Sequence, residues 1–204
     1  MLSYILLSLF PGVLHEVTPI ESPSINEVLL ASSTIPDVPF YSQFADISSP
    51  KWKKVGCGIT SLTMVVDYYK PQIATVNELL EQGLDEGAYI AGAGWSHQGL
   101  VRVSKNYGLN GQTYDLSGST SKAAFTYFKD QLKDGPIIVS VHYKMDPKNP
   151  IPHLVVINGI DSDTLYYNDP AAKTAAKEIS APDFQKAWKK RFIVIRPEEK
   201  LADL

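Results

Sequence analysis

The sequence is poor in cysteine and carries no excess of basic residues. Its 204 residues include one cysteine, Cys57, so no disulfide can form within the chain and a packed core must hold the fold. Lys and Arg number 19 against 22 Asp and Glu, which gives a net charge of −3. Because nucleic-acid-binding domains carry a basic surface, this balance predicts no nucleic-acid partner. The short lysine runs near residues 51–54 and 186–191 are interpreted as solvated faces.

The sequence also lacks metal-binding spacings and a membrane-spanning stretch. Its four histidines are scattered along the chain, so we expect neither a metal nor a cofactor. The apolar stretch MLSYILLSLF at the start is too short to cross a bilayer as a helix, so we expect no stable membrane span. This stretch fits an export signal, an anchor remnant or a packing segment, and it favours an extracellular or cell-surface location over a cytoplasmic one.

The length suits one well-buried domain and is too small for two large ones. Residues 11–35 are rich in Pro, Ser, Thr and Glu and show no periodicity, which is typical of an extended arm or linker. We therefore predict an N-terminal arm over 1–34 that is a weak signal or a linker, one compact domain over 35–197, and a C-terminal tail over 198–204. The sequence does not indicate the oligomeric state.

Helices are predicted in the first part of the domain and strands in the second. Apolar residues recur at helical spacing along CGITSLTMVVDYY, which ends before Pro71, and further helices are expected after Thr75, over 97–107 and 121–134, and after Ser180. The β-branched runs IIVSVHY, HLVVINGI, TLYYND and FIVI predict strands, the first three forming a meander. This order predicts an α+β fold of the papain-like kind, in which the helix that begins near Cys57 packs on an antiparallel sheet.

Cys57 is the candidate nucleophile. A thiol at a helix N-terminus faces unpaired backbone N–H groups and the positive end of the helix dipole, and both favour its ionised, nucleophilic form. Gly56 and Gly58 flank it and are expected to let a substrate carbonyl approach closely. The alternative is a small buried cysteine with no chemical role.

His153, at the start of one predicted strand, is the candidate base. Asp169 follows it by 16 residues, at the end of the next strand, so the two side chains are expected to meet as antiparallel neighbours. The carboxylate would then fix the imidazole tautomer, as in other catalytic triads. Asn168 is an alternative partner for the imidazole, and His97 is an alternative base.

Two further segments are expected to border the substrate. Gln43 precedes Cys57 by 14 residues, and its amide could join the Cys57 backbone N–H in an oxyanion hole. The glycine-rich loop 87–99 contains Trp95 and His97, which we predict to line one wall of a substrate cleft.

These segments together resemble a known family. VPFYSQ, GCGITSLTMVVDYY, GWSHQGLVRVSKNYGL, HLVVINGID and YYNDPA, within residues 36–170, are similar to the bacteriocin-processing, double-glycine-leader cysteine peptidases, family thirty-nine of the cysteine peptidases. The resemblance is greatest to the family's stand-alone bacterial relatives. It implies a papain-like fold with Cys57 as nucleophile, His153 as base, Asp169 as its orienting partner and Gln43 as oxyanion donor.

The expected function is therefore that of a thiol protease, a hydrolase that cleaves peptide or amide bonds through a thioacyl-enzyme. Two alternatives remain: an acyltransferase or transglutaminase-type enzyme with the same triad, and a catalytically silent peptide-binding module. Ile59 stands where the family commonly has proline, and the chain shows neither a transporter's membrane domain nor its ATP-binding domain. Cleavage of leader peptides after a double glycine is for this reason not assumed.

Overall fold

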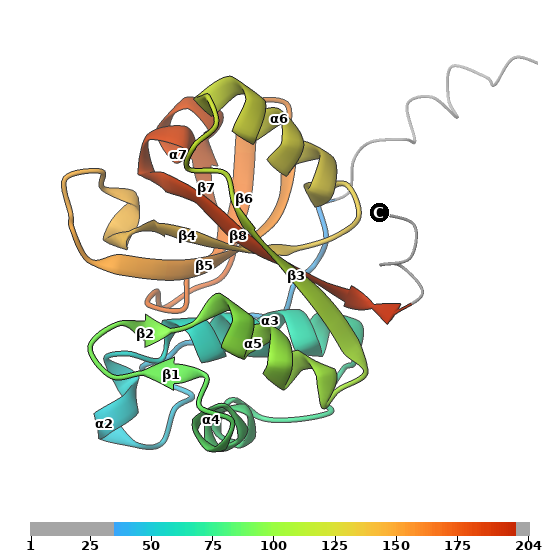
Figure 1. Cartoon of the computed structure of the whole chain (residues 1–204), viewed down its shortest axis with the longest axis vertical. Coiled ribbons are helices and arrows are strands. Elements are labelled where there is room, and N and C mark those ends of the chain that lie inside the picture. The colour runs from blue at the N-terminus through green and yellow to red at the C-terminus, as the bar shows by residue number, and fades with distance from the viewer. Residues whose placement is uncertain (1–34, 199–204) are drawn as a thin grey trace, which may run out of the picture. The chain divides into compact units, whose positions relative to one another are not determined.

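The computed structural model describes residues 35–198, coloured in Figure 1. The predicted N-terminal arm, residues 1–34, and the predicted tail beyond residue 198 lie outside the described residues.

A six-stranded antiparallel sheet forms the centre of the fold. Its strand order is β3-β8-β4-β5-β6-β7, so the predicted meander is present as β4-β5-β6. The last strand in the chain, β8, lies between β3 and β4. Their bounds are β3 (Leu109–Asp115), β4 (Ile137–His142), β5 (Pro152–Asp161), β6 (Thr164–Asn168), β7 (Lys177–Ser180) and β8 (Trp188–Pro197).

Helices cover both faces of this sheet, as Figure 1 shows. One face carries α3 (Cys57–Tyr69) and α5 (His97–Lys105), with α4 (Val76–Asp85) packed against these two helices, whereas the other face carries α6 (Ser121–Leu132) and α7 (Ala181–Ala187). Alternate strand residues serve the two layers: Ile138 packs with the α3 side, and its neighbours Ile137 and Val139 pack with the α6 side. The predicted α+β class, with a helix on an antiparallel sheet, is confirmed.

Local sequence signals explain where the helices begin. Thr75 and Glu78 form a reciprocal capping box at the start of α4, and Ser180 caps α7 through a bond from the Asp183 N–H. Strands β3 and β7 of the sheet were not predicted, nor were four short elements that lie in the loops. These are α2 (Pro50–Lys53), β1 (Tyr89–Ile90), β2 (Gly94–Trp95) and the 3₁₀ turn η1 (Tyr143–Met145).

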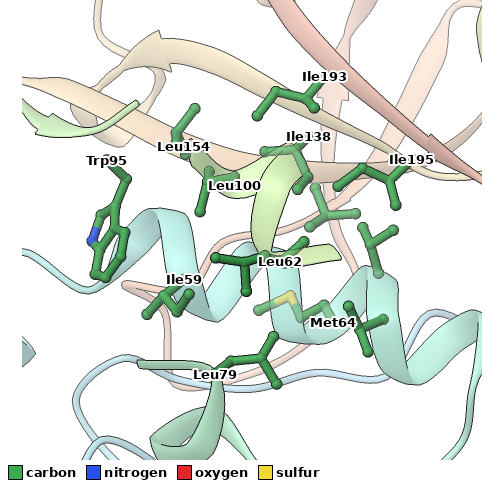
Figure 2. Packing of buried hydrophobic residues seen from close by; sticks show 14 of the residues in the cluster. Ile59, Leu62, Met64, Leu79, Trp95, Leu100, Ile138, Leu154, Ile193 and Ile195 are labelled. Carbon is green, nitrogen blue, oxygen red and sulfur yellow. The ribbon is translucent and has the colours of Figure 1, made fainter. Parts of the chain in front are cut away.

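Helix α3 is buried along most of its length, and its packing sets the position of its first residue. Leu62 and Met64 are fully buried between α4 and the sheet, as Figure 2 shows. The Ser61 hydroxyl also donates to the carbonyl of Leu154 on β5 at 3.2 Å. Because Leu154 follows His153 directly, this contact fixes the start of α3 relative to the histidine.

A buried arginine on β8 binds the C-terminal end of α6 and the turn that leads into β4. Arg196 on β8 has no solvent exposure, and its guanidinium donates to the carbonyls of Pro136, Gln131, Gly135 and Ile195 at 2.8–3.2 Å. Because the last carbonyls of a helix lack partners within it, Arg196 completes the C-terminal end of α6 and the turn into β4.

Candidate active site

Cys57 is the first residue of α3, and Gly56 is its N-cap. Its thiol is free and half-buried. The side chain therefore lies beside the unpaired N–H groups and the positive dipole end of a 13-residue helix, the setting that the sequence predicted.

His153 and Asp169 form a direct hydrogen bond. The imidazole Nε2 lies 2.7 Å from the Asp169 Oδ1, and the same oxygen accepts the Ala171 backbone N–H at 2.8 Å. His153 is only 5% exposed. Because Nε2 faces the carboxylate, Nδ1 is the ring nitrogen left to face Cys57.

A β-bulge decides which residue of the Asn168–Asp169 pair meets the histidine. The register of β5 against β6 shifts between Ile157 and Gly159. On the side of this bulge that is nearer His153, Val156 lies opposite Asn168. A one-residue change of register exchanges the two faces of a strand, so Asp169 comes to the face that His153 shares. The Asn168 side chain instead donates to the Val38 carbonyl at 2.9 Å and accepts the Ala176 N–H.

The charges at this site support a protonated imidazole. Burial alone would lower the pKa of His153, but hydrogen bonds to Asp169 and to Cys57 outweigh it and raise the pKa to about 9. Burial would raise the pKa of Asp169, but the bond to His153 and the Ala171 N–H hold that pKa below its usual range. His153 and Asp169 can therefore face each other as an imidazolium and a carboxylate.

Gln43 lies at the same cleft and is held from two sides. Its backbone N–H donates to the Pro170 carbonyl at 2.8 Å, next to Asp169, and its side-chain Nε2 donates to the Lys53 carbonyl at 2.7 Å. The side chain is 3% exposed. An amide nitrogen carries two N–H groups, so one remains for a group bound beside Cys57.

A cleft of about 890 Å³ contains these residues. Its lining includes five of the eight predicted site residues: Gln43, Cys57, Trp95, His97 and His153. Asp169 does not line the cleft but is bonded to His153, which does. A volume of this size lies within the range of ligand and peptide sites.

The loop 87–99 forms a wall of this cleft. It folds into the hairpin of β1 and β2, in which Tyr89 pairs with Trp95. The Trp95 indole N–H donates to the Val55 carbonyl at 2.7 Å, two residues before Cys57. The ring also packs edge-on against Tyr89, with 5.4 Å between centroids.

His97 lines the cleft but bonds away from the thiol. Its Nε2 lies 2.8 Å from the Ser140 hydroxyl on β4. Burial lowers the pKa of His97, and the nearby Arg191 guanidinium lowers it further, so the ring is neutral at pH 7. The contact with Ser140 leaves His153 as the histidine that faces Cys57.

Gly56 and Gly58 do not line the cleft, which differs from the role expected for them. A Cβ at Gly56 would lie 2.2 Å from the Ile47 side chain, and a Cβ at Gly58 would lie 2.6 Å from the Trp95 Cβ. Both glycines therefore make room for protein side chains, and Gly58 lets the Trp95 wall approach α3 closely.

Sequence reasoning missed the part of the cleft that lies on the sheet. This part is formed by Thr113, Asp115, Ser140, Lys189 and Arg191. These residues were missed because β3 was not predicted and because β8 begins before the apolar run FIVI from which a strand was predicted.

Among residues 35–198, no group of three His, Cys, Asp or Glu side chains is arranged to hold a metal. In the same range, no helix has the length and apolar character to cross a membrane.

Comparison with known proteins gives consistent matches. The model of the Peptidase_C39 like family matches residues 35–192. The pediocin PA-1 transport/processing ATP-binding protein PedD of Pediococcus acidilactici is 28% identical over 148 residues, which are 71% of this chain and 18% of that protein. The chain thus corresponds to less than a fifth of that relative.

Solved structures share the fold at low identity. A putative C39-like peptidase from Bacillus anthracis is similar with a TM-score of 0.58 and 19% identity, over 80% of this chain and 98% of that one. A double-glycine-motif protease from an AMS/PCAT transporter, in complex with the leader peptide, has a TM-score of 0.54 and 22% identity, over 81% of this chain and 96% of that one. The peptidase domain of Streptococcus ComA has a TM-score of 0.54 and 21% identity, over 71% of this chain and 93% of that one.

Proposed function

Because the chain belongs to the Peptidase_C39 like family, which comprises cysteine peptidases, we propose that it cleaves peptide bonds through a thioester on Cys57. The observation that carries the proposal is the 2.7 Å bond between His153 Nε2 and the Asp169 carboxylate, which leaves Nδ1 for the thiol. The resemblance drawn from the sequence motifs is confirmed by the family match.

In the proposed reaction, the Cys57 thiolate attacks the substrate carbonyl carbon while His153 holds the proton. The carbonyl oxygen becomes an oxyanion, which the free Gln43 amide N–H and the Cys57 backbone N–H stabilise. His153 then protonates the leaving amine as the C–N bond breaks, and a thioester remains on Cys57. Water, activated by the neutral imidazole, attacks the thioester and releases the carboxylic acid and the thiol.

Asp169 acts on this sequence through the imidazole. Its hydrogen bond to Nε2 keeps Nδ1 toward the sulfur and stabilises the imidazolium that the first step requires. The loop 87–99 and Gln43 stand beside the thiol and would position the peptide. The solved structure of the AMS/PCAT transporter protease holds a leader peptide, so a double-glycine peptide is the first substrate to test. The extracellular or cell-surface location stays a prediction.

The test is intact-mass analysis after treatment with an electrophilic peptide aldehyde or chloromethyl ketone. We expect a single adduct that is lost in Cys57→Ser and slowed at least about tenfold in His153→Ala, since the thiolate is then uncompensated. The matched control is His142→Ala, because the His142 ring bonds the Asn149 carbonyl instead of the triad. Absence of an adduct without denaturant would mean that Cys57 is structural.

Turnover of a fluorogenic peptide separates the remaining alternatives. Hydrolysis releases a free acid, whereas an acyltransferase forms an amide when a primary amine is added. A protein that forms the adduct but turns over no peptide in a broad library is a binding module instead of a peptidase.

A further inference from the structure

The part of the cleft on the sheet forms a continuous row away from the triad. Leu154 on β5 lies opposite Ser140 on β4, Ser140 lies opposite Arg191 on β8, and Arg191 lies opposite Asp115 on β3. All four residues line the cleft. Neighbouring strands are about 4.8 Å apart, so the backbone of Arg191 lies roughly 10 Å from that of Leu154, beside His153.

Hydrogen-bond donors dominate the far end of this row. The Arg191 Nε donates to the Asp115 carboxylate at 2.9 Å. That contact occupies one side of the guanidinium, and the two Nη groups make no hydrogen bond or ion pair with residues 35–198. Asp115 also accepts the Ser117 N–H, so its carboxylate is already engaged. The Asp115 contact therefore orients a fork whose outer edge is free for an anion.

Neighbouring groups add donors and positive charge. Lys189 lines the cleft and has no acidic partner within the described part of the chain. The neutral His97 ring has one N–H and Ser140 has one O–H, and the 2.8 Å bond between them uses one of these two donors. The other donor remains for a hydrogen bond to a ligand. Apart from Cys57 and His153, the charged residues that line the cleft are three cations, Lys54, Lys189 and Arg191, and one carboxylate, Asp115, whereas the chain carries a net charge of −3.

We propose that this end of the cleft, with Arg191 as its main contact, is a specificity site for a carboxylate of the peptide substrate. The proposal rests on the proposed peptidase function and adds its substrate class. An extended chain advances about 3.3 Å per residue, so about three residues span the roughly 10 Å from Leu154, beside His153, to Arg191. Arg191 and Lys189 supply charge, Asp115 positions the guanidinium, and the His97–Ser140 pair donates the further hydrogen bond.

The experiment uses peptide pairs that differ only by Glu or Gln at each of the three positions on either side of the cleaved bond. We expect one position at which Glu raises kcat/KM about tenfold over Gln, because a charged acceptor makes the stronger hydrogen bond. The preference should weaken as salt rises from low ionic strength. Arg191→Gln should remove it, Arg191→Lys should keep part of it, and Arg191→Glu should favour Lys at that position.

The control variant is Lys122→Gln, which removes the same charge from an exposed position on α6 outside the cleft and should leave the Glu preference unchanged. Because the Arg191 side chain is about half exposed, its replacement should fold, and thermal melting checks this. Asp115→Asn is a second variant that leaves Arg191 in place and should weaken the preference. Equal cleavage of the Glu and Gln peptides, or a preference that survives Arg191→Gln, overturns the proposal.

Two further arms identify the source of the carboxylate and separate this proposal from the peptidase function. A neutral peptide with a free C-terminus one to three residues after the cleaved bond, compared with its amide, tests a chain-terminal carboxylate against an acidic side chain. Fluorescence anisotropy with Cys57→Ser measures binding of the Glu and Gln peptides without turnover. If the Glu peptide binds more tightly than the Gln peptide but the native chain cleaves neither, only the peptidase function is refuted. If the two peptides bind equally, the specificity site is refuted.

Discussion

Replacing Asp169 by Asn removes the charge that faces His153 while it keeps an oxygen that can accept the imidazole N–H. Burial lowers the pKa of His153, and the bonds to Asp169 and Cys57 raise it to about 9 from an ordinary value of 6.5. This difference corresponds to about 3 kcal/mol in favour of the imidazolium. Because Cys57 retains part of the effect, we expect Asp169→Asn to lose roughly half of it, or about one pH unit.

The assay is the pH dependence of kcat/KM, which reports ionisations of the free enzyme. For the native chain we expect the alkaline limb near pH 9, where His153 loses its proton. In Asp169→Asn this limb should move about one pH unit lower, and kcat at pH 8 should fall about tenfold or more. Asp163→Asn, an exposed carboxylate in the turn after β5, should leave the profile unchanged. An unchanged limb in Asp169→Asn would refute the assignment.

Folding stability should show the same ionisation. The folded pKa of His153 exceeds its unfolded value of 6.5, so its contribution is complete below pH 6.5 and is lost as pH rises through about 9. The folded pKa of Asp169 is lowered, so its contribution is present above pH 3.8 and is lost as pH falls through the folded pKa. Asp169→Asn should therefore reduce the free energy of unfolding most between about pH 4 and 6.5, by about 1.5 kcal/mol, and least above pH 9.

Three other predictions concern the cleft. Gln43→Ala should lower kcat by about 100- to 1,000-fold with little change in KM, as steady-state kinetics would show; near-native kcat would exclude Gln43 from the oxyanion hole. His153→Ala should lose nearly all turnover, whereas His97→Ala should mainly raise KM, and equal kcat losses in the two variants would contradict their separate roles. Gly58→Ala should destabilise the fold by about 1–3 kcal/mol in urea unfolding, because the new Cβ meets the Trp95 Cβ at 2.6 Å; an unchanged midpoint would mean that the hairpin yields easily.

The helix and strand assignments nearest the triad were predictable because each rests on a local signal. Helical spacing and Pro71 define α3, and two β-branched runs joined by a short turn bring His153 near the end of β6. The choice between Asn168 and Asp169 was not predictable. It depends on the bulge between Ile157 and Gly159, and a bulge of one residue leaves no periodic mark in a continuously apolar strand.

The sheet end of the cleft was hidden for a different reason. Strand β3, with the sequence LNGQTYD, contains a glycine and several polar residues, so its own pattern does not predict a strand. It is a strand because β8 pairs with it along its length. The charged residues Lys189 and Arg191 at the start of β8 likewise resemble a solvated loop when read alone. Only the register across three strands, β3, β8 and β4, brings Asp115, Ser140 and Arg191 to one row.

The place of β8 between β3 and β4 has a consequence for how the protein is made. A ribosome synthesises β8 after every other strand of the sheet, yet β3 pairs with the sheet only through β8, and β8 also covers the edge of β4 that faces away from β5. Until residue 197 has left the exit tunnel, both strands keep open edges, and the C-terminal end of α6 lacks Arg196. The nascent chain thus holds Cys57, His153 and Asp169 long before it can form the complete cleft. Hydrolytic activity should therefore begin only after β8 has been synthesised and has paired with both neighbouring strands.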